Sequence, residues 1–202
     1  MSATWNCVAT LVTEMPVNCL LHDPSRPDVL WYGMYSHHSD SHREGGISSW
    51  RFKENMDDKP LLRESLQLPG VFDLTPTTTT HSTCDALVCC TDGSVRGVST
   101  RGSSCETAPI AEIQWQAAVD GEMITSCCEL GTAEDPLSVL GCSAHLGTLT
   151  MMTRGTDGGY EPVRKWHGHE FDAWCVASHL RGNGGCSSAD DGTDHLMWSG
   201  GD

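Results

Sequence analysis

The sequence predicts an all-β fold built from repeated small sheets, and three observations lead to this prediction. Apolar runs are short and bounded by Gly, Pro, Asp and Asn, which is typical of strands joined by tight turns. No stretch keeps a 3.6-residue apolar period over three helical turns. Turn-type glycines recur at a constant interval, because Gly93, Gly147 and Gly201 follow one another at the same spacing.

The strands expected in the first part of the chain are short, and they are either strongly apolar or alternating. Residues 29–35 form the first strong strand, and residues 37–46 are expected to be a polar loop. The alternating run 47–52 predicts the next strand. Residues 61–68 and 71–74 follow, separated by a Pro-Gly pair.

A tight hairpin is expected at residues 91–94, after a buried strand at 85–90. Its Asp92-Gly93 pair supplies the positive φ that such turns require. Residues 95–100 return from the turn. The remaining expected strands are residues 111–116, 122–127, 137–142, 148–152, 163–166 and 195–198.

The segment from Trp166 to Trp174 is typical of the opening of a propeller blade, because Gly-His precedes an acidic and aromatic strand start. Ser199-Gly200-Gly201-Asp202 is interpreted as the turn later in that blade. The glycine interval is slightly longer than the ~40–45 residues of a WD-repeat blade, which fits blades with long loops.

We therefore predict a WD-repeat β-propeller of about three and a half blades, with the whole chain in one domain. The expected blades are residues 1–60, 61–110, 111–165 and 166–202, the last of them incomplete. A propeller needs at least four blades, so the ring is expected to be open. Its free sheet edges would make such a fragment prone to aggregation on its own.

Composition argues against two classes of partner. A formal net charge of -15 and a pI near 4.8 argue against binding nucleic acid or an anionic membrane, since both are polyanionic. The start of the sequence has neither a basic n-region nor an apolar h-region, which favours a cytoplasmic protein. The 11 cysteines are then expected to be reduced thiols, and no Cys-x-x-Cys pair suggests zinc.

Two C-terminal motifs resemble the diphthine methyl ester hydrolases, the WD-repeat family of diphthamide biosynthesis. The family carries a His-x-Phe-(Glu/Asp)-Ala-Trp segment, matched here by His169 to Trp174. The family's later Tyr-Ser-Gly-Gly-Asp-Asp-Gly motif is matched by Trp198 to Asp202. The resemblance is close over the last 40 residues and thin elsewhere, and the loop from Cys186 to Asp194 is irregular for the family.

The resemblance implies a carboxylic ester hydrolase that frees the carboxylate of diphthine on translation elongation factor 2. No metal or organic cofactor is implied. The sequence has no Gly-x-Ser-x-Gly nucleophile elbow, so an α/β-hydrolase mechanism is not supported. The alternative is a non-enzymatic WD-repeat scaffold that binds a protein partner.

Five residues are candidates for the site. In the catalytic interpretation, His169 is the general base, Glu170 or Asp172 orients it, and Asp202 lies nearby. In the structural interpretation, His169, Ser199 and Asp202 form a hydrogen-bonded network that stabilises the blade.

Other conspicuous residues have structural interpretations. His37, His38 and His42 are expected in a solvated loop rather than a metal site. Five tryptophans are expected chiefly in blade cores or between blades: Trp31, Trp50, Trp115, Trp166 and Trp174. The adjacent pairs Cys89-Cys90 and Cys127-Cys128 should point to opposite sheet faces.

Overall fold

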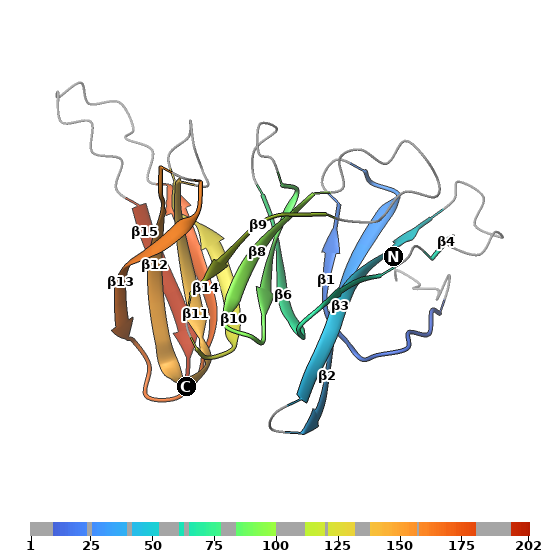
Figure 1. Cartoon of the computed structure of the whole chain (residues 1–202), viewed down its shortest axis with the longest axis horizontal. Coiled ribbons are helices and arrows are strands. Elements are labelled where there is room, and N and C mark those ends of the chain that lie inside the picture. The colour runs from blue at the N-terminus through green and yellow to red at the C-terminus, as the bar shows by residue number, and fades with distance from the viewer. Residues whose placement is uncertain are drawn as a thin grey trace, which may run out of the picture.

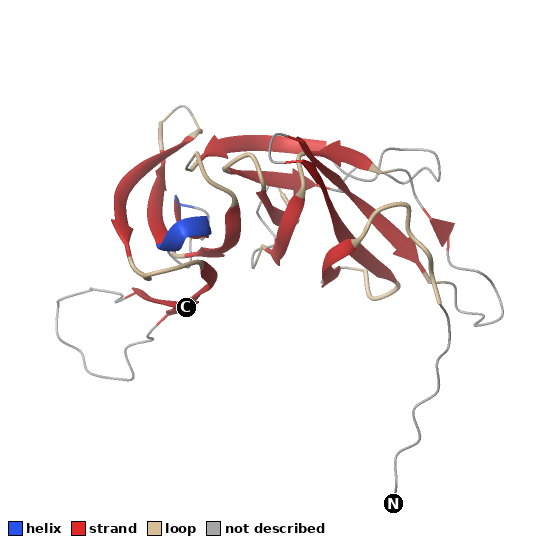
Figure 2. Cartoon of the chain, turned by 90° about the horizontal axis from the view of Figure 1, so that it is seen from below, coloured by secondary structure: helices blue, strands red, loops and turns tan. Residues whose placement is uncertain are grey.

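The computed structural model confirms the all-β fold (Figure 1). It describes residues 10–23, 26–39, 42–52, 61–62, 65–77, 84–99, 112–119, 121–131, 138–156, 158–180 and 195–202. These residues form fifteen strands and one short 3-10 helix, η2 (His145–Gly147), the helical turn drawn in Figure 2. No helix within the described ranges is long and apolar enough to cross a membrane.

The strands pair into four antiparallel sheets in chain order. The first sheet contains β1 (Val17–His22), β2 (Val29–Ser39) and β3 (His42–Arg51), with β4 (Leu61–Leu62) and β5 (Leu66–Leu68) both paired to β3. The second contains β6 (Val71–Pro76), β7 (Ala86–Cys90), β8 (Ser94–Ser99) and β9 (Glu112–Ala118). The third contains β10 (Ile124–Glu129), β11 (Val139–Ala144), β12 (Thr148–Arg154) and β13 (Tyr160–His167). The fourth pairs β14 (Ala173–Leu180) with β15 (His195–Gly201).

The sheets follow one another from right to left in Figure 1 and are joined at their first strands, because β1 lies against β6, β6 against β10, and β10 against β14. Each first strand has a β-bulge at its second residue, where one extra residue interrupts the pairing with the next strand. The bulged residues are Asn18, Phe72, Thr125 and Trp174. This shared irregularity aligns the four sheets residue by residue and shows that they are repeats of one unit.

Apolar side chains fill the spaces between successive sheets. Trp31, Leu74 and Val88 belong to the cluster between the first and second sheets. Leu87 and Leu140 belong to the cluster between the second and third. A smaller cluster joins the third and fourth sheets, and a fourth one covers the outer side of the first sheet. The core is therefore a series of layers between sheets, as expected for stacked repeats.

Two turns form as the sequence predicts. Gly93 has a φ of 78° in the turn between β7 and β8, and Gly147 has a φ of 75° in the turn between β11 and β12. These two glycines occupy equivalent places in the second and third sheets. Gly201 does not, because it pairs with Ala173 as the last residue of β15. The interpretation of residues 199–202 as a turn is therefore wrong, since the strand continues to Gly201.

The structure corrects two of the expected strand boundaries. The expected polar loop at 37–46 is a long hairpin, because β2 runs to Ser39 and β3 starts at His42. Residues 61–68 are not one strand but the separate β4 and β5. The expected blades 1–60, 61–110, 111–165 and 166–202 stay a prediction. Residues 66–68 pair with the first sheet, and residues 112–118 pair with the second.

Replacing Leu87 with Ala is expected to lower the free energy of unfolding by about 2–5 kcal/mol, because a fully buried leucine leaves a cavity between two sheets. Ile113→Ala is the matched control, since Ile113 is 44% exposed on the neighbouring part of the second sheet. Urea unfolding followed by tryptophan fluorescence measures both changes. Equal effects of the two substitutions would show that the second and third sheets do not pack together in solution.

Candidate functional site

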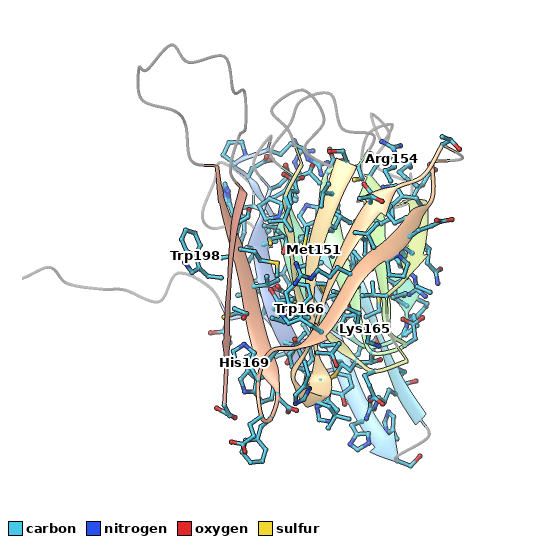
Figure 3. The ribbon with its side chains drawn as sticks, turned by 90° about the vertical axis from the view of Figure 1, so that its left-hand side faces the viewer. Met151, Arg154, Lys165, Trp166, His169 and Trp198 are labelled. Carbon is cyan, nitrogen blue, oxygen red and sulfur yellow. The ribbon has the colours of Figure 1, made fainter. Side chains whose placement is uncertain are left out.

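The candidate residues lie at the hairpin that forms the fourth sheet. His169 sits in the turn before β14, and Ser199 lies on β15. The Nε2 atom of His169 is 2.8 Å from Oγ of Ser199, so the two side chains share a hydrogen bond. The His169 ring also packs against Gly201, where an added Cβ would lie 2.7 Å from Nδ1. Gly201 is thus required because a side chain there would displace the imidazole. Figure 3 labels His169 at the lower end of this hairpin.

Asp172 points to the third sheet rather than to His169. Its Oδ1 atom accepts a hydrogen bond of 3.0 Å from the backbone N–H of Leu146. Nδ1 of His145 lies 2.8 Å from the same oxygen. Leu146 has a φ of 63°, a strained conformation for a non-glycine residue, and the Asp172 carboxylate holds this turn in place. Asp172 therefore fastens the turn of η2 to the start of the fourth sheet.

Asp202 binds the bulged tryptophan of its own sheet. Its Oδ2 atom accepts a hydrogen bond of 3.2 Å from Nε1 of Trp174. Its backbone N–H and C=O pair with Asp172 and Phe171, which closes the hairpin. The expected three-residue network thus divides into two pairs, His169 with Ser199 and Asp202 with Trp174.

Glu170 is exposed, and within the described ranges it has no hydrogen bond or ion pair. The structure therefore brings together a histidine and a serine, but it does not place a carboxylate on the second ring nitrogen of the histidine. A Ser–His pair can move a proton between Oγ and Nε2. A third group that orients the histidine, as in a triad, is absent from the described contacts of His169.

A row of aromatic side chains lies beside this hairpin at the bulged ends of the first strands. The Phe72 and Trp174 rings stack with centroids 6.4 Å apart, and Tyr35 lies 6.4 Å from Phe72 on the other side. We call Tyr35, Phe72 and Trp174 the aromatic row. Trp174 is 44% exposed and stacks on Phe72 of another sheet, so it makes a contact between blades, one of the two positions expected for it. No sequence signal marked the aromatic row, because the bulge register that aligns its residues is visible only in the strand pairing.

The other tryptophans and the histidines are largely structural. Trp31 and Trp50 are buried, Trp115 packs against the core, and Trp166 lies under the guanidinium of Arg164 at 5.4 Å. His37 and His38 lie on β2, and Nε2 of His38 is 2.6 Å from a Glu44 carboxylate oxygen. No cluster of three metal-binding side chains occurs within the described ranges.

Among the described residues, the buried cysteines are unsuited to nucleophilic chemistry. Burial raises the pKa of Cys19, Cys90 and Cys128 to about 12 in each case. Burial and contact with Cys127 raise the pKa of Cys89. Cys89 packs between the second and third sheets, whereas Cys90 packs between the first and second. The adjacent cysteines thus point to opposite faces, as predicted. Cys89, Cys90 and Cys128 stay protonated at neutral pH because their pKa values are raised.

Three antiparallel sheets and a two-stranded hairpin, joined at their bulged first strands, define an incomplete β-propeller. Solved structures of Sqt1 from Chaetomium thermophilum share this fold, one with a TM-score of 0.57 and 14% identity over 80% of this chain and 38% of that one. Sqt1 from Saccharomyces cerevisiae gives a TM-score of 0.55 and 14% identity over 91% of this chain and 42% of that one. The chain thus spans less than half the length of these proteins. No family model and no curated protein matches the sequence.

Replacing His169 with Ala is expected to lower the free energy of unfolding by about 1–2 kcal/mol, because Ser199 loses its hydrogen-bond partner and Gly201 its packing neighbour. His167→Ala is the control, since His167 is exposed on β13. Thermal unfolding of His169→Ala, Ser199→Ala and the double variant would give the coupling energy of the pair. Additive effects of the two substitutions would show that the hydrogen bond contributes nothing to stability.

Proposed function

We propose that this chain is part of a cytoplasmic WD-repeat propeller that binds a protein partner at the aromatic row. The observation that supports this is the continuous line of rings from Tyr35 to Trp174, which crosses from the first sheet to the fourth. Aromatic side chains are enriched at the centres of protein interfaces because they bury a large area with little loss of side-chain entropy. The exposed Phe171, at 64%, adjoins Trp174 in the hairpin.

The partner we propose is translation elongation factor 2 in its diphthine methyl ester form. This part of the proposal rests on the resemblance of residues 169–174 and 198–202 to the diphthine methyl ester hydrolases. A propeller offers a rigid rim, and its bulged strand ends lie where a large protein surface can reach them.

A second candidate function is hydrolysis of that methyl ester to a carboxylate and methanol. The observation that favours it is the 2.8 Å hydrogen bond between His169 and Ser199, beside the aromatic row. In such a reaction His169 accepts a proton from the Ser199 hydroxyl or from a water that attacks the ester carbonyl. The same hydrogen bond also stabilises the hairpin, so a structural and a catalytic role must be separated by experiment.

Replacing Phe72 with Ala is expected to weaken binding of elongation factor 2 by about 30-fold, the effect of removing an aromatic hot spot from an interface. Phe52→Ala is the matched control, because Phe52 is 41% exposed and lies after β3, outside the aromatic row. Biolayer interferometry with the immobilised factor measures both affinities. Equal affinities for the two variants would exclude the aromatic row as the binding surface.

Ester hydrolysis is tested by incubating a trace of the chain with an excess of methylated elongation factor 2 and following the loss of one methyl group by mass spectrometry. Catalysis by the Ser–His pair predicts that His169→Gln lowers the rate by about 100-fold or more. His167→Gln should keep the full rate. Stoichiometric binding without loss of the methyl group supports the scaffold function and excludes hydrolysis by this chain.

A further inference from the structure

The three rings of the aromatic row are spaced so that one positive charge can lie close to two of them. The centroids of Tyr35 and Phe72 are 6.4 Å apart, and so are those of Phe72 and Trp174. A cation is attracted to an aromatic face within about 6 Å of the ring centroid. The planes of Tyr35 and Phe72 are inclined by 56°, so these two rings do not cover each other face to face. A cation beside Phe72 can therefore interact with two rings at once.

The surrounding structure holds two of these rings in place. Gly70 packs against the Tyr35 ring, because a Cβ added at Gly70 would overlap the Cδ2 atom of Tyr35. Tyr35 also stacks on His37 of the same strand, with centroids 6.5 Å apart. Nδ2 of Asn18 donates a hydrogen bond of 2.7 Å to the Phe72 carbonyl, which fixes the bulged backbone of β6. Rings that are already held lose little conformational entropy when a ligand binds to them.

Two carboxylates give the row a negative environment. Oδ2 of Asp202 accepts the hydrogen bond of Nε1 of Trp174, and this bond polarises the indole. Asp73 follows Phe72 in β6, and its charge reaches the first sheet. Burial and, after it, the negative charge of Asp73 raise the pKa of Cys19 to about 12.

The chain does not supply a lysine or arginine of its own to these rings. Among the described residues, Arg164 lies over Trp166, and no lysine or arginine lies over a ring of the aromatic row. The row therefore combines aromatic faces with negative charge and leaves the matching cation to a ligand.

The hydrogen bonds of Asp73 favour a cation without N–H groups. Its two oxygens accept bonds from the Leu74 N–H at 2.9 Å and from Oγ of Ser126 at 3.0 Å. A guanidinium is bound best by a carboxylate whose two oxygens are both available for its paired N–H donors. A quaternary ammonium group has no N–H donor, so aromatic faces in a negative environment are sufficient for it.

We propose that the aromatic row binds a quaternary ammonium group carried by the protein partner. The inference rests on the proposed function, because it names the chemical group that the same row contacts. The rings of Tyr35, Phe72 and Trp174 supply the cation–π attraction. Asp73 and Asp202 supply the negative charge that complements the cation.

NMR titration of the full 202-residue chain with choline chloride tests the ligand class, followed at the indole N–H of Trp174. The matched probe is 3,3-dimethyl-1-butanol, which has the shape of choline but a carbon in place of the charged nitrogen. At equal ionic strength, choline should bind about tenfold more tightly than the alcohol, because only the cation gains from the ring faces and the carboxylates. Equal affinities would overturn the proposal and show that the row is an apolar surface only.

Phe72→Leu removes the ring but keeps an apolar side chain at the same place. It should weaken choline binding about fivefold and leave the affinity for the alcohol unchanged. Phe52→Leu is the control, since Phe52 lies outside the aromatic row. If the amide spectrum shows that Phe72→Leu does not fold, Tyr35→Leu makes the same test at the neighbouring ring. Unchanged choline binding by a folded variant would contradict the proposal.

Competition separates this inference from the proposed function. Choline should displace elongation factor 2 from the wild-type chain in biolayer interferometry, whereas the alcohol at the same concentration should not. If the factor binds through Phe72 but choline does not bind, the proposed function is supported and the inference is wrong. If choline binds but the factor does not, the ligand class is supported and the proposed function is wrong. Choline that binds without displacing the factor would overturn the assignment of the group to this partner.

Discussion

The structure depends on one contact, made three times, between the first strands of neighbouring sheets. Each contact combines apolar packing with hydrogen bonds across the interface. Nδ2 of Asn18 donates to the Phe72 carbonyl at 2.7 Å, and Oγ1 of Thr75 donates to the Cys127 carbonyl at 3.1 Å. Oγ of Ser178 donates to the Glu129 carbonyl at 2.5 Å. A single sheet of this size cannot bury its two faces alone, so the repeated contact is what makes each sheet stable.

The bulges in the first strands determine which side chains lie beside that contact. Each first strand has its extra residue at the same place, near its beginning. Four equivalent side chains therefore lie at the beginnings of the four first strands. In the first and third sheets they are the polar Asn18 and Thr125, which bind the backbone of the following sheet. In the second and fourth they are Phe72 and Trp174, which stack on each other. The bulge therefore holds neighbouring sheets together at Asn18 and Thr125. At Phe72 and Trp174 the same bulge forms an aromatic surface.

The hairpin of the fourth sheet shows why residue type alone does not distinguish a catalytic group from a structural one. His169 and Ser199 have the chemistry of a nucleophile and its base, yet their hydrogen bond also ties the turn to β15. The two nearby aspartates bind elsewhere, Asp172 at Leu146 and Asp202 at Trp174. Turnover is therefore the property that separates the two roles, because both depend on the same hydrogen bond.

The sequence by itself determined the fold class, the short strands and the turns at Gly93 and Gly147, because alternation and turn-forming residues are local properties of the chain. It also singled out His169, Ser199 and Asp202 as a hydrogen-bonded network, of which the His169–Ser199 bond forms. The tertiary structure decided which sheet each strand joins, as with residues 112–118, and that Asp202 binds Trp174 instead of His169. It also decided which rings form the aromatic row. The physical reason is that a bulge shifts the register by one residue, and only the pairing of strands far apart in the sequence reveals which side chains then share a face.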